Sequence, residues 1–357
     1  MSVADGEDMT LNAGDVVEVR SEAEILRSLD ANGRLEELPF MPQMFEYCGK
    51  RFKVFKRAHK TCDTVNPVAG RRMHDAVHLD IRCDGRAYAG CQAGCLIFWK
   101  EAWLKPVGNN SSDEVRVISG ASGASCTKEA VLKATCGQDK RGETRYFCQA
   151  TQLPYYTSPL SPWSVGQYLE DYISGNVTLG QLFRGFLYVS YYHLTLAKRN
   201  RLGRPARWLY DQFQALWGGI PFPRRVGPIP VGQPTPTSNL DLQPGELVRV
   251  KLYKDILLTL DTHHKNQGMS FDAEQVPFCG KVFRVNTRVE RFLNEKTGKL
   301  TKMKTPAVIL DGVWCQSRYS NCRMFCPRAI YSWWRENWLE RVKKDDPAGM
   351  PPQSGQN

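Results

Sequence analysis

The sequence predicts an α+β fold, mainly β, in which two homologous small domains flank a mixed or helical insert. Three observations lead to this prediction. Residues 13–107 and 244–342 carry the same landmarks in the same order. Each of these segments contains several short strand-like runs separated by glycine-containing turns. The region between them has a different and partly helical pattern.

The repeat can be read directly from the sequence. Gly14 and Gly245 each open a G-x-x-V-x-V run, and each stands equally far before a Cys-Gly-Lys triplet, at Cys48 and Cys279. Both segments then reach a Leu-Asp pair and close on a Trp-rich run, FWKEAWLKPV in the first and WWRENWLERV in the second. The repeated unit is about 95 residues long, which is the size of a small domain.

The strand-like runs within each segment indicate a small barrel. In the first segment RFKVFKR and AVHLDIRC predict strands, EAEILRSLD a helical turn, and CLIFWKEAWL a strand that runs into a short helix. The G-x-x-V-x-V opening resembles the first strand of SH3-like barrels, including KOW-type modules. The whole arrangement resembles uncharacterised Cys-rich bacterial proteins. This resemblance implies two SH3-like barrels and no particular function.

The insert, residues 108–220, contains two helical patterns. The run SPWSVGQYLEDYISGN predicts a helix with Ser161 as N-cap and Gly175 near its end. Residues 179–197 are a longer apolar run with a basic flank, which suits either a buried helix or an amphipathic helix on a membrane surface. Polar residues recur through this run and argue against a membrane-spanning helix.

The remaining parts of the chain predict linkers and tails. Residues 221–243 are rich in proline and glycine and predict an extended linker to the second repeated segment. Residues 1–12 and 343–357 are expected to be disordered tails. The start, MSVADGEDMT, lacks the basic and apolar regions of a secretory signal, so a cytoplasmic location is expected.

The cysteines are the strongest chemical signal. In a reducing cytoplasm, twelve cysteines are expected to be metal ligands or reactive thiols rather than disulfides. Each repeated segment holds a set of four, one in the Cys-Gly-Lys triplet and three clustered, and Cys62 of the first segment is not part of the repeated set. The two sets are Cys48, Cys83, Cys91 and Cys95, and Cys279, Cys315, Cys322 and Cys326. Four thiolates suit a tetrahedral Zn²⁺ site or an iron–sulfur cluster, while buried cysteines without a ligand are the alternative.

Four further cysteines lie outside the repeated pattern, and they are Cys62, Cys126, Cys136 and Cys148. They predict a third site, to which His59 could add a ligand because it stands three residues before Cys62. A site unlike the other two is the expected place for functional chemistry, since duplicated sites are more often structural.

Other candidate residues carry weaker signals. His74, Asp75, His78 and Asp80 could form a proton-transfer or ligand group, with surface or hydrogen-bonded histidines as the alternative. His263 and His264 are expected to be solvated. Five tryptophans lie near basic residues and could stack nucleic-acid bases, although core packing is the alternative. They are Trp99, Trp103, Trp333, Trp334 and Trp338, beside Lys100, Arg335 and Arg341.

These observations leave three functional hypotheses. The first is a zinc-binding scaffold or adaptor with a protein partner. The second is an iron–sulfur or thiol redox protein that acts at the unrepeated cysteines. The third is a nucleic-acid-binding protein, which the net charge of +11 permits. Peripheral membrane contact through 179–197 is compatible with each. The chain contains none of the common nucleotide-binding, hydrolase or metalloprotease motifs.

Overall fold

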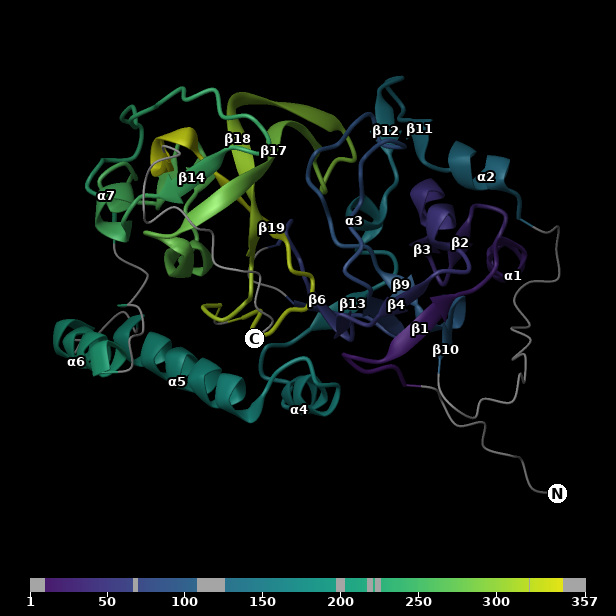
Figure 1. Cartoon of the computed structure of the whole chain (residues 1–357), viewed down its shortest axis with the longest axis horizontal. Coiled ribbons are helices and arrows are strands. Elements are labelled where there is room, and N and C mark those ends of the chain that lie inside the picture. The colour runs from purple at the N-terminus through teal and green to yellow at the C-terminus, as the bar shows by residue number, and fades with distance from the viewer. Residues whose placement is uncertain are drawn as a thin grey trace. The chain divides into compact units, whose positions relative to one another are not determined.

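The computed structural model describes residues 10–66, 70–107, 126–196, 203–216, 221, 226–320 and 322–342 (Figure 1). The chain divides into two compact units. The first consists of residues 1–182, 293–301 and 325–328, and the second of residues 183–292, 302–324 and 329–357. The predicted tails, apart from residues 10–12, lie outside the described residues.

The first unit is built from short strands and helices. Its elements before the insert are β1 (Val16–Val19), α1 (Glu22–Ser28), β2 (Arg34–Leu35), β3 (Leu38–Pro39), η1 (Pro42–Tyr47), β4 (Arg51–Lys53), β5 (Lys56–Arg57), β6 (Lys60–Cys62), β7 (Gly70–Arg72), β8 (Ala76–His78), β9 (Trp99–Lys100), η2 (Glu101–Trp103) and β10 (Leu104–Pro106). The insert adds α2 (Lys128–Lys133), β11 (Cys136–Gln138), β12 (Thr144–Tyr146), α3 (Gln149–Gln152), β13 (Ser158–Leu160) and α4 (Gly166–Ile173).

The strands of the first unit form small open sheets. β1 pairs antiparallel with β4 and β10, β8 with β5 and β9, and β7 with β6 and β13. Among the described residues the chain is mixed α+β, and its sheets do not close into the barrels that the sequence predicted. The first segment distributes its strands over separate small sheets, and the second segment has one open five-stranded sheet.

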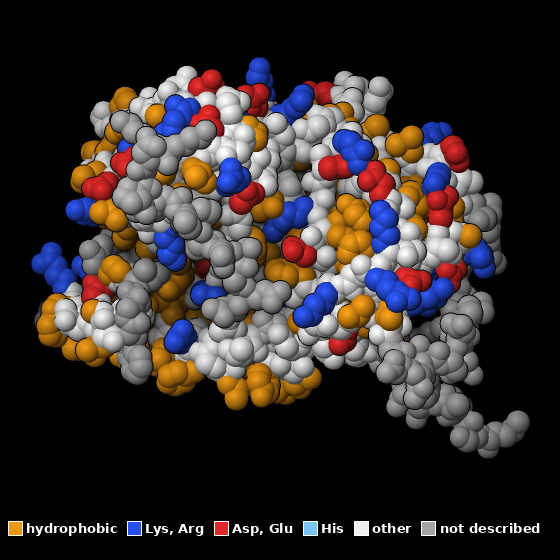
Figure 2. Space-filling view, viewed as in Figure 1, with side chains coloured by type: hydrophobic (Ala, Val, Ile, Leu, Met, Phe, Trp, Pro, Cys, Tyr) orange, Lys and Arg blue, Asp and Glu red, His pale blue; other side chains and the backbone are white. Residues whose placement is uncertain are grey.

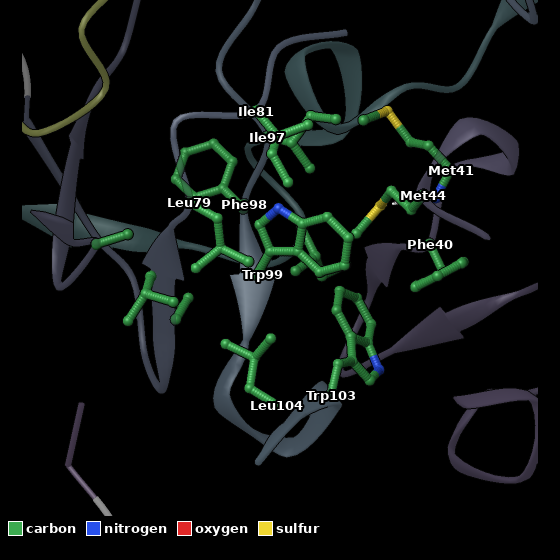
Figure 3. Packing of buried hydrophobic residues seen from close by; sticks show 14 of the residues in the cluster. Phe40, Met41, Met44, Leu79, Ile81, Ile97, Phe98, Trp99, Trp103 and Leu104 are labelled. Atoms are coloured by element: carbon green, nitrogen blue, oxygen red, sulfur yellow. Dashed lines mark hydrogen bonds between the residues drawn. The ribbon is translucent and has the colours of Figure 1, made fainter. Parts of the chain in front are cut away.

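The core of the first unit surrounds two tryptophans of the repeated segment. Trp99 and Trp103 are fully buried. Figure 3 shows them packed among aliphatic, methionine and phenylalanine side chains that come from several elements. Phe40 meets Trp103 edge-on, with ring centroids 5.1 Å apart. Because large aromatic side chains bury the most apolar area, these tryptophans dominate the stability of the unit.

The second unit contains two longer helices and one large sheet. Its elements are α5 (Leu179–Leu196, of which the first turn belongs to the first unit), α6 (Gly203–Leu216), β14 (Leu247–Val250), α7 (Tyr253–Leu257), β15 (Lys265–Asn266), β16 (Met269–Ser270), η3 (Ala273–Phe278), β17 (Val282–Leu293), β18 (Leu300–Trp314), β19 (Tyr331–Trp334), η4 (Glu336–Trp338) and β20 (Leu339–Arg341). The sheet has the strand order β19-β18-β17-β14-β20.

The segments 13–107 and 244–342 place matching side chains in matching contacts. β1 lies between β4 and β10, and β14 lies between β17 and β20. Trp334 and Trp338 are fully buried, like Trp99 and Trp103. Trp103 Nε1 donates to Ser28 Oγ at 3.2 Å, and Trp338 Nε1 donates to Thr259 Oγ1 at 3.0 Å. The tryptophans are therefore core residues in both segments.

A buried carboxylate follows the first of these tryptophans in each segment. Glu101 accepts from the guanidinium of Arg57 at 2.6 Å and from the amide of Leu11 at 3.0 Å. Glu336 accepts from Arg288 at 2.7 Å and from three backbone amides, those of Leu240, Asp241 and Leu242. Each carboxylate thus links a strand arginine to the residues just before β1 or β14 through hydrogen bonds.

The insert and the linker differ from their predicted form. α4 begins at Gly166, with Val165 rather than Ser161 as N-cap, because the side chain of Ser161 instead accepts from the amide of Trp163 in a tight turn. The predicted linker packs onto the second unit where it is described. Thr235 accepts from the amide of Gln267, and Leu242 is fully buried.

Candidate functional site

Four cysteines of the first unit line one cavity of about 30 Å³. Cys83, Cys91 and Cys95 lie in the loop between β8 and β9, and Cys148 is the N-cap of α3. The lining also includes Tyr88, Phe98, Leu293 and Arg328. The four thiols therefore come from two segments far apart in the sequence and share one largely apolar chamber.

A glycine allows the cysteine loop to close. Gly85 has φ 71°, and a Cβ at this position would lie 1.9 Å from the carbonyl oxygen of Cys91. The amides of Tyr88 and Gly90 donate to the Gly85 carbonyl, and the amide of Cys83 donates to the Cys95 carbonyl at 2.8 Å. Any other residue at position 85 would push the two sides of the loop apart.

N–H groups point at three of the four sulfurs. Gln43 Nε2 donates to Cys83 Sγ at 3.2 Å, and the amide of Leu293 donates to Cys91 Sγ at 3.3 Å. The thiol of Cys148 accepts a hydrogen bond from the backbone amide of Thr151 at the start of α3. Donors of this kind stabilise negative charge on sulfur, and they are one way in which proteins tune metal-bound thiolates.

A buried arginine supplies positive charge beside the cavity. The side chain of Arg328 is 2% exposed, and its guanidinium donates to Glu295 at 2.9 Å and to the carbonyl of Cys62 at 3.2 Å. Burial alone would lower the pKa of Arg328, but the nearby carboxylate of Glu295 raises it well above its usual value. Arg328 therefore stays charged and forms an ion pair with Glu295 at the lining of the cavity.

Burial disfavours the thiolate form of three of these cysteines, Cys83, Cys95 and Cys148, when nothing is bound to them. It raises the pKa of Cys83 to about 12 and that of Cys95 well above its ordinary value, and it raises the pKa of Cys148 as well. Cys83, Cys91 and Cys95 are only half-buried as whole residues, so the loop lies near the surface while its thiols turn inward. Binding of a metal here would release protons.

The cavity differs from the first predicted ligand set in one residue. Cys48 does not line it, because this thiol lies at the end of η1 beside the charges of Glu22 and Lys128. Cys148, which the sequence assigned to the third set, takes its place. The described residues contain no group of three or more His, Cys, Asp or Glu side chains that could hold a metal ion as they are placed.

The second predicted set is divided between the two units. Cys326 belongs to the first unit, where its sulfur accepts from the amide of Cys62 at 3.1 Å. Cys279, Cys315 and Cys322 belong to the second unit. Cys279 points at the Gln275 carbonyl, and Cys315 Sγ lies 3.5 Å from Ser317 Oγ.

The third predicted set is dispersed within the first unit. Cys148 lines the cavity, and Cys62 lies beside Cys326. Cys126 is buried next to Thr127, and Cys136 is exposed on β11. His59 lies next to a carboxylate rather than a thiol, with Nε2 3.1 Å from Asp171 Oδ1. Sequence proximity to Cys62 was therefore a poor guide, since neighbouring strand residues point in opposite directions.

Sequence reasoning missed the buried charged group around Asp171. This carboxylate on α4 is fully buried and accepts from Lys60 Nζ at 2.5 Å. Lys60 lies over the ring of Tyr168, 4.9 Å from its centroid, and burial lowers the pKa of this lysine. The group anchors the polar side of α4 to β6. No local pattern marks it, because its members lie far apart in the sequence.

The weaker candidates fall into ordinary surroundings. His74 is exposed, as are Asp75 and Asp80, whereas His78 is fully buried and its Nδ1 lies 2.8 Å from the Ile97 carbonyl. Burial lowers the pKa of His78 to about 3, so this histidine stays neutral and does not form a proton-transfer pair with His74. His263 is exposed and His264 is half-buried.

Four of the five tryptophans that the sequence offered for base stacking are core residues. Trp99, Trp103, Trp334 and Trp338 are fully buried, and only Trp333 is half-buried. Lys100 and Arg335 are also buried. The repeated tryptophans cannot stack on nucleic-acid bases because protein atoms already cover both faces of the rings.

Comparison of the chain with protein-family models finds no match, and comparison with curated proteins finds none either.

Proposed function

We propose that the chain is an iron–sulfur protein whose cluster is held by Cys83, Cys91, Cys95 and Cys148. The observation that carries this proposal is the position of the four thiols around one shared cavity of about 30 Å³. A structural Zn²⁺ draws four sulfurs to about 2.3 Å from one point and leaves no cavity between them. A cluster instead places its own iron and sulfide atoms between the thiolates.

One feature of the lining supports a cluster. N–H groups donate to the sulfurs of Cys83 and Cys91, and such donors offset the net negative charge that the thiolates and sulfides of a cluster carry in an apolar site.

The function that this site supports best is one-electron transfer. The cysteine loop is half-buried, so a cluster there would lie close to the surface and could exchange electrons with a partner. The surrounding apolar residues, such as Tyr88 and Phe98, would limit access of water to the cluster. Solvent access and hydrogen bonds to sulfur set the reduction potential of such clusters.

The test is the iron and acid-labile sulfide content of protein purified without oxygen, together with its visible absorption spectrum. Iron, sulfide and a brown colour are expected in the wild type. Cys83→Ala and Cys148→Ala should lose them, and circular dichroism should check that both variants fold. Cys136→Ala and Cys48→Ala are the controls and should keep the cluster, because neither residue lines the cavity. Wild-type protein that contains neither iron nor sulfide would overturn the proposal.

A zinc-stapled scaffold is the second candidate. It is favoured by the duplicated tryptophan–carboxylate core, which resembles a structural module used twice. In this case the same purification would give colourless protein with zinc, and removal of zinc would unfold the cysteine loop. The two candidates use the same four thiols, so the metal found in the wild type decides between them.

A further inference from the structure

The two long helices of the second unit expose their apolar sides. On α5, Phe183 is 65% exposed and Leu194 is 66% exposed, with Leu187 also exposed between them. These residues recur at helical spacing and form one stripe. On α6, Trp208, Leu209 and Leu216 are exposed, the last of them by 82%. We call these six residues the α5–α6 face.

The inner side of the same helices is lined by tyrosines. Tyr188 is 3% exposed and packs against Tyr192 and Tyr319, with ring centroids 6.2 and 5.2 Å apart. Tyr191 of α5 stacks on Tyr210 of α6 at 4.3 Å. A helix on a protein surface usually buries its leucines and phenylalanines and exposes its more polar residues. α5 and α6 do the opposite, so their apolar side is available to something outside the chain.

The charge of the segment identifies the kind of surface that fits. Residues 183–216 include the basic residues Arg184, Lys198, Arg199, Arg201, Arg204 and Arg207 and a single acidic residue, Asp211. Arg184 and Arg204 are exposed on the same two helices as the apolar stripes. Leucine, phenylalanine and tryptophan on one side with arginine at the flanks is the composition of helices that lie in an anionic lipid interface.

Among the described residues, none of the helices combines the length and the apolar character that a membrane span requires. The geometry therefore points to a surface on which α5 and α6 lie flat. We propose that the α5–α6 face docks the chain on an anionic lipid membrane, with the leucine, phenylalanine and tryptophan side chains in the acyl region and the arginines at the headgroups. Figure 2 shows hydrophobic side chains gathered over these two helices.

α4 repeats this inversion in the first unit. Val165, Leu169 and Ile173 are exposed along one side of α4, while Gln167 and Asp171 on the other side are buried. Its buried side holds the polar contacts to Lys60 described above. α4 carries no basic residue, so it lacks the charge that favours an anionic membrane and is left out of the proposed face.

The experiment is sedimentation of the full chain with vesicles, either of phosphatidylcholine alone or of a mixture with phosphatidylglycerol. The wild type is expected to bind the anionic vesicles at least tenfold more tightly than the neutral ones, and to be released as salt rises. Phe183→Ser combined with Leu209→Ser should reduce binding at least tenfold. Leu258→Ser, an equally exposed leucine of the second unit, should leave binding unchanged. Arg184→Glu with Arg204→Glu should remove the preference for anionic vesicles.

Three results would overturn the proposal. One is wild-type protein that stays in the supernatant with both kinds of vesicle. Another is equal binding by the Phe183/Leu209 variant. The third is a lipid-free oligomer of the wild type that the same two substitutions convert to a monomer, which would show that a second copy of the chain covers the face. Light scattering after size-exclusion chromatography measures this last case. The proposal does not depend on the metal content of the cysteine cavity.

Discussion

Residues 13–107 and 244–342 place corresponding side chains around their buried tryptophans, whereas their cysteines occupy different surroundings. Three cysteines of the first segment share a cavity with Cys148 of the insert. The matching cysteines of the second segment are divided between the two units. The matched part is thus the tryptophan–carboxylate core, and the unmatched part is the thiol chemistry. A site that needs residues from outside the repeated pattern is a better candidate for function than a site that is duplicated.

Removal of a core tryptophan should have the largest effect. Trp103→Ala and Trp338→Ala are each expected to lower the free energy of unfolding by about 3–5 kcal/mol, because each ring is fully buried and donates a hydrogen bond to a serine or threonine. Urea-induced unfolding measures this. Trp208→Ala, at an exposed position, should change it by no more than about 0.5 kcal/mol. A small loss for only one of the two core variants would show that the segments are not equivalent.

Replacement of the strand arginines Arg57 and Arg288 should lower the free energy of unfolding by different amounts in the two segments. Arg57→Met should cost about 3 kcal/mol, because it leaves the buried Glu101 with one backbone donor. Arg288→Met should cost less, about 1–2 kcal/mol, because Glu336 keeps three backbone donors. Urea unfolding of both variants at neutral pH is the measurement. Equal losses would mean that the backbone amides do not replace the arginine.

Lowering the pH should reduce the loss of stability caused by Arg57→Met. Burial raises the pKa of Glu101 even with Arg57 present, so without the arginine the carboxyl group will protonate more readily. A carboxyl group with a raised pKa in the folded state stabilises the fold more as the pH falls through that value. The deficit of Arg57→Met should therefore shrink as the pH is lowered below neutral. A deficit that stays constant with pH would place the cost in lost packing of the arginine stem.

The sequence could predict the core but only part of the site. The tryptophans repeat at matched positions, and α5 follows from a mainly apolar run. Cys83, Cys91 and Cys95 stand close together in the chain, so their shared cavity was foreseeable. Cys148 was not, because it reaches the cavity through folding of the insert, and no spacing encodes that contact. The repeat predicts Cys48 as a ligand on pattern alone, whereas in the structure this residue does not line the cavity.

The inversion of α5 and α6 could not be predicted either. Their pattern shows an apolar side and a tyrosine-rich side, and both could pack against protein. Only the burial of Tyr188 and the exposure of Phe183 and Leu194 decide which side faces outward. In the same way, the sequence pattern predicts Asp171 as an exposed residue of an amphipathic helix, and only the structure shows its contact with Lys60.

The matched cysteines at the ends of η1 and η3 should differ in reactivity. Burial raises the pKa of both thiols, that of Cys279 to about 12, while at Cys48 the charge of Glu22 adds to the rise and that of Lys128 partly counters it. The thiolate is the reactive form, so iodoacetamide should alkylate Cys48 about tenfold faster than Cys279 at mildly alkaline pH. Peptide mass spectrometry over time measures both rates, with the exposed Cys136 as the fast reference. Faster reaction of Cys279 would contradict the burial argument.

The smallest expected difference lies in the helix that follows the first strand of each segment. Ser21 caps α1 in a reciprocal capping box with Glu24, whereas the matching helix α7 has Leu252 as its N-cap, whose side chain makes no capping hydrogen bond. Ser21→Ala should lower the free energy of unfolding by about 1 kcal/mol at neutral pH, and Leu252→Ser should raise it by about 0.5 kcal/mol.

Burial alone would raise the pKa of Glu24, but hydrogen bonds from Ser21 and Lys105 lower it from 4.5 to about 2. A carboxyl group with a lowered pKa stabilises the fold above its unfolded value and stops doing so as the pH falls through the folded one. The cost of Ser21→Ala should therefore be full above about pH 4.5 and fade toward pH 2, as measured by urea unfolding across that range. A cost that stays the same at the acid end would mean that the serine hydroxyl alone, without the glutamate, stabilises the start of α1.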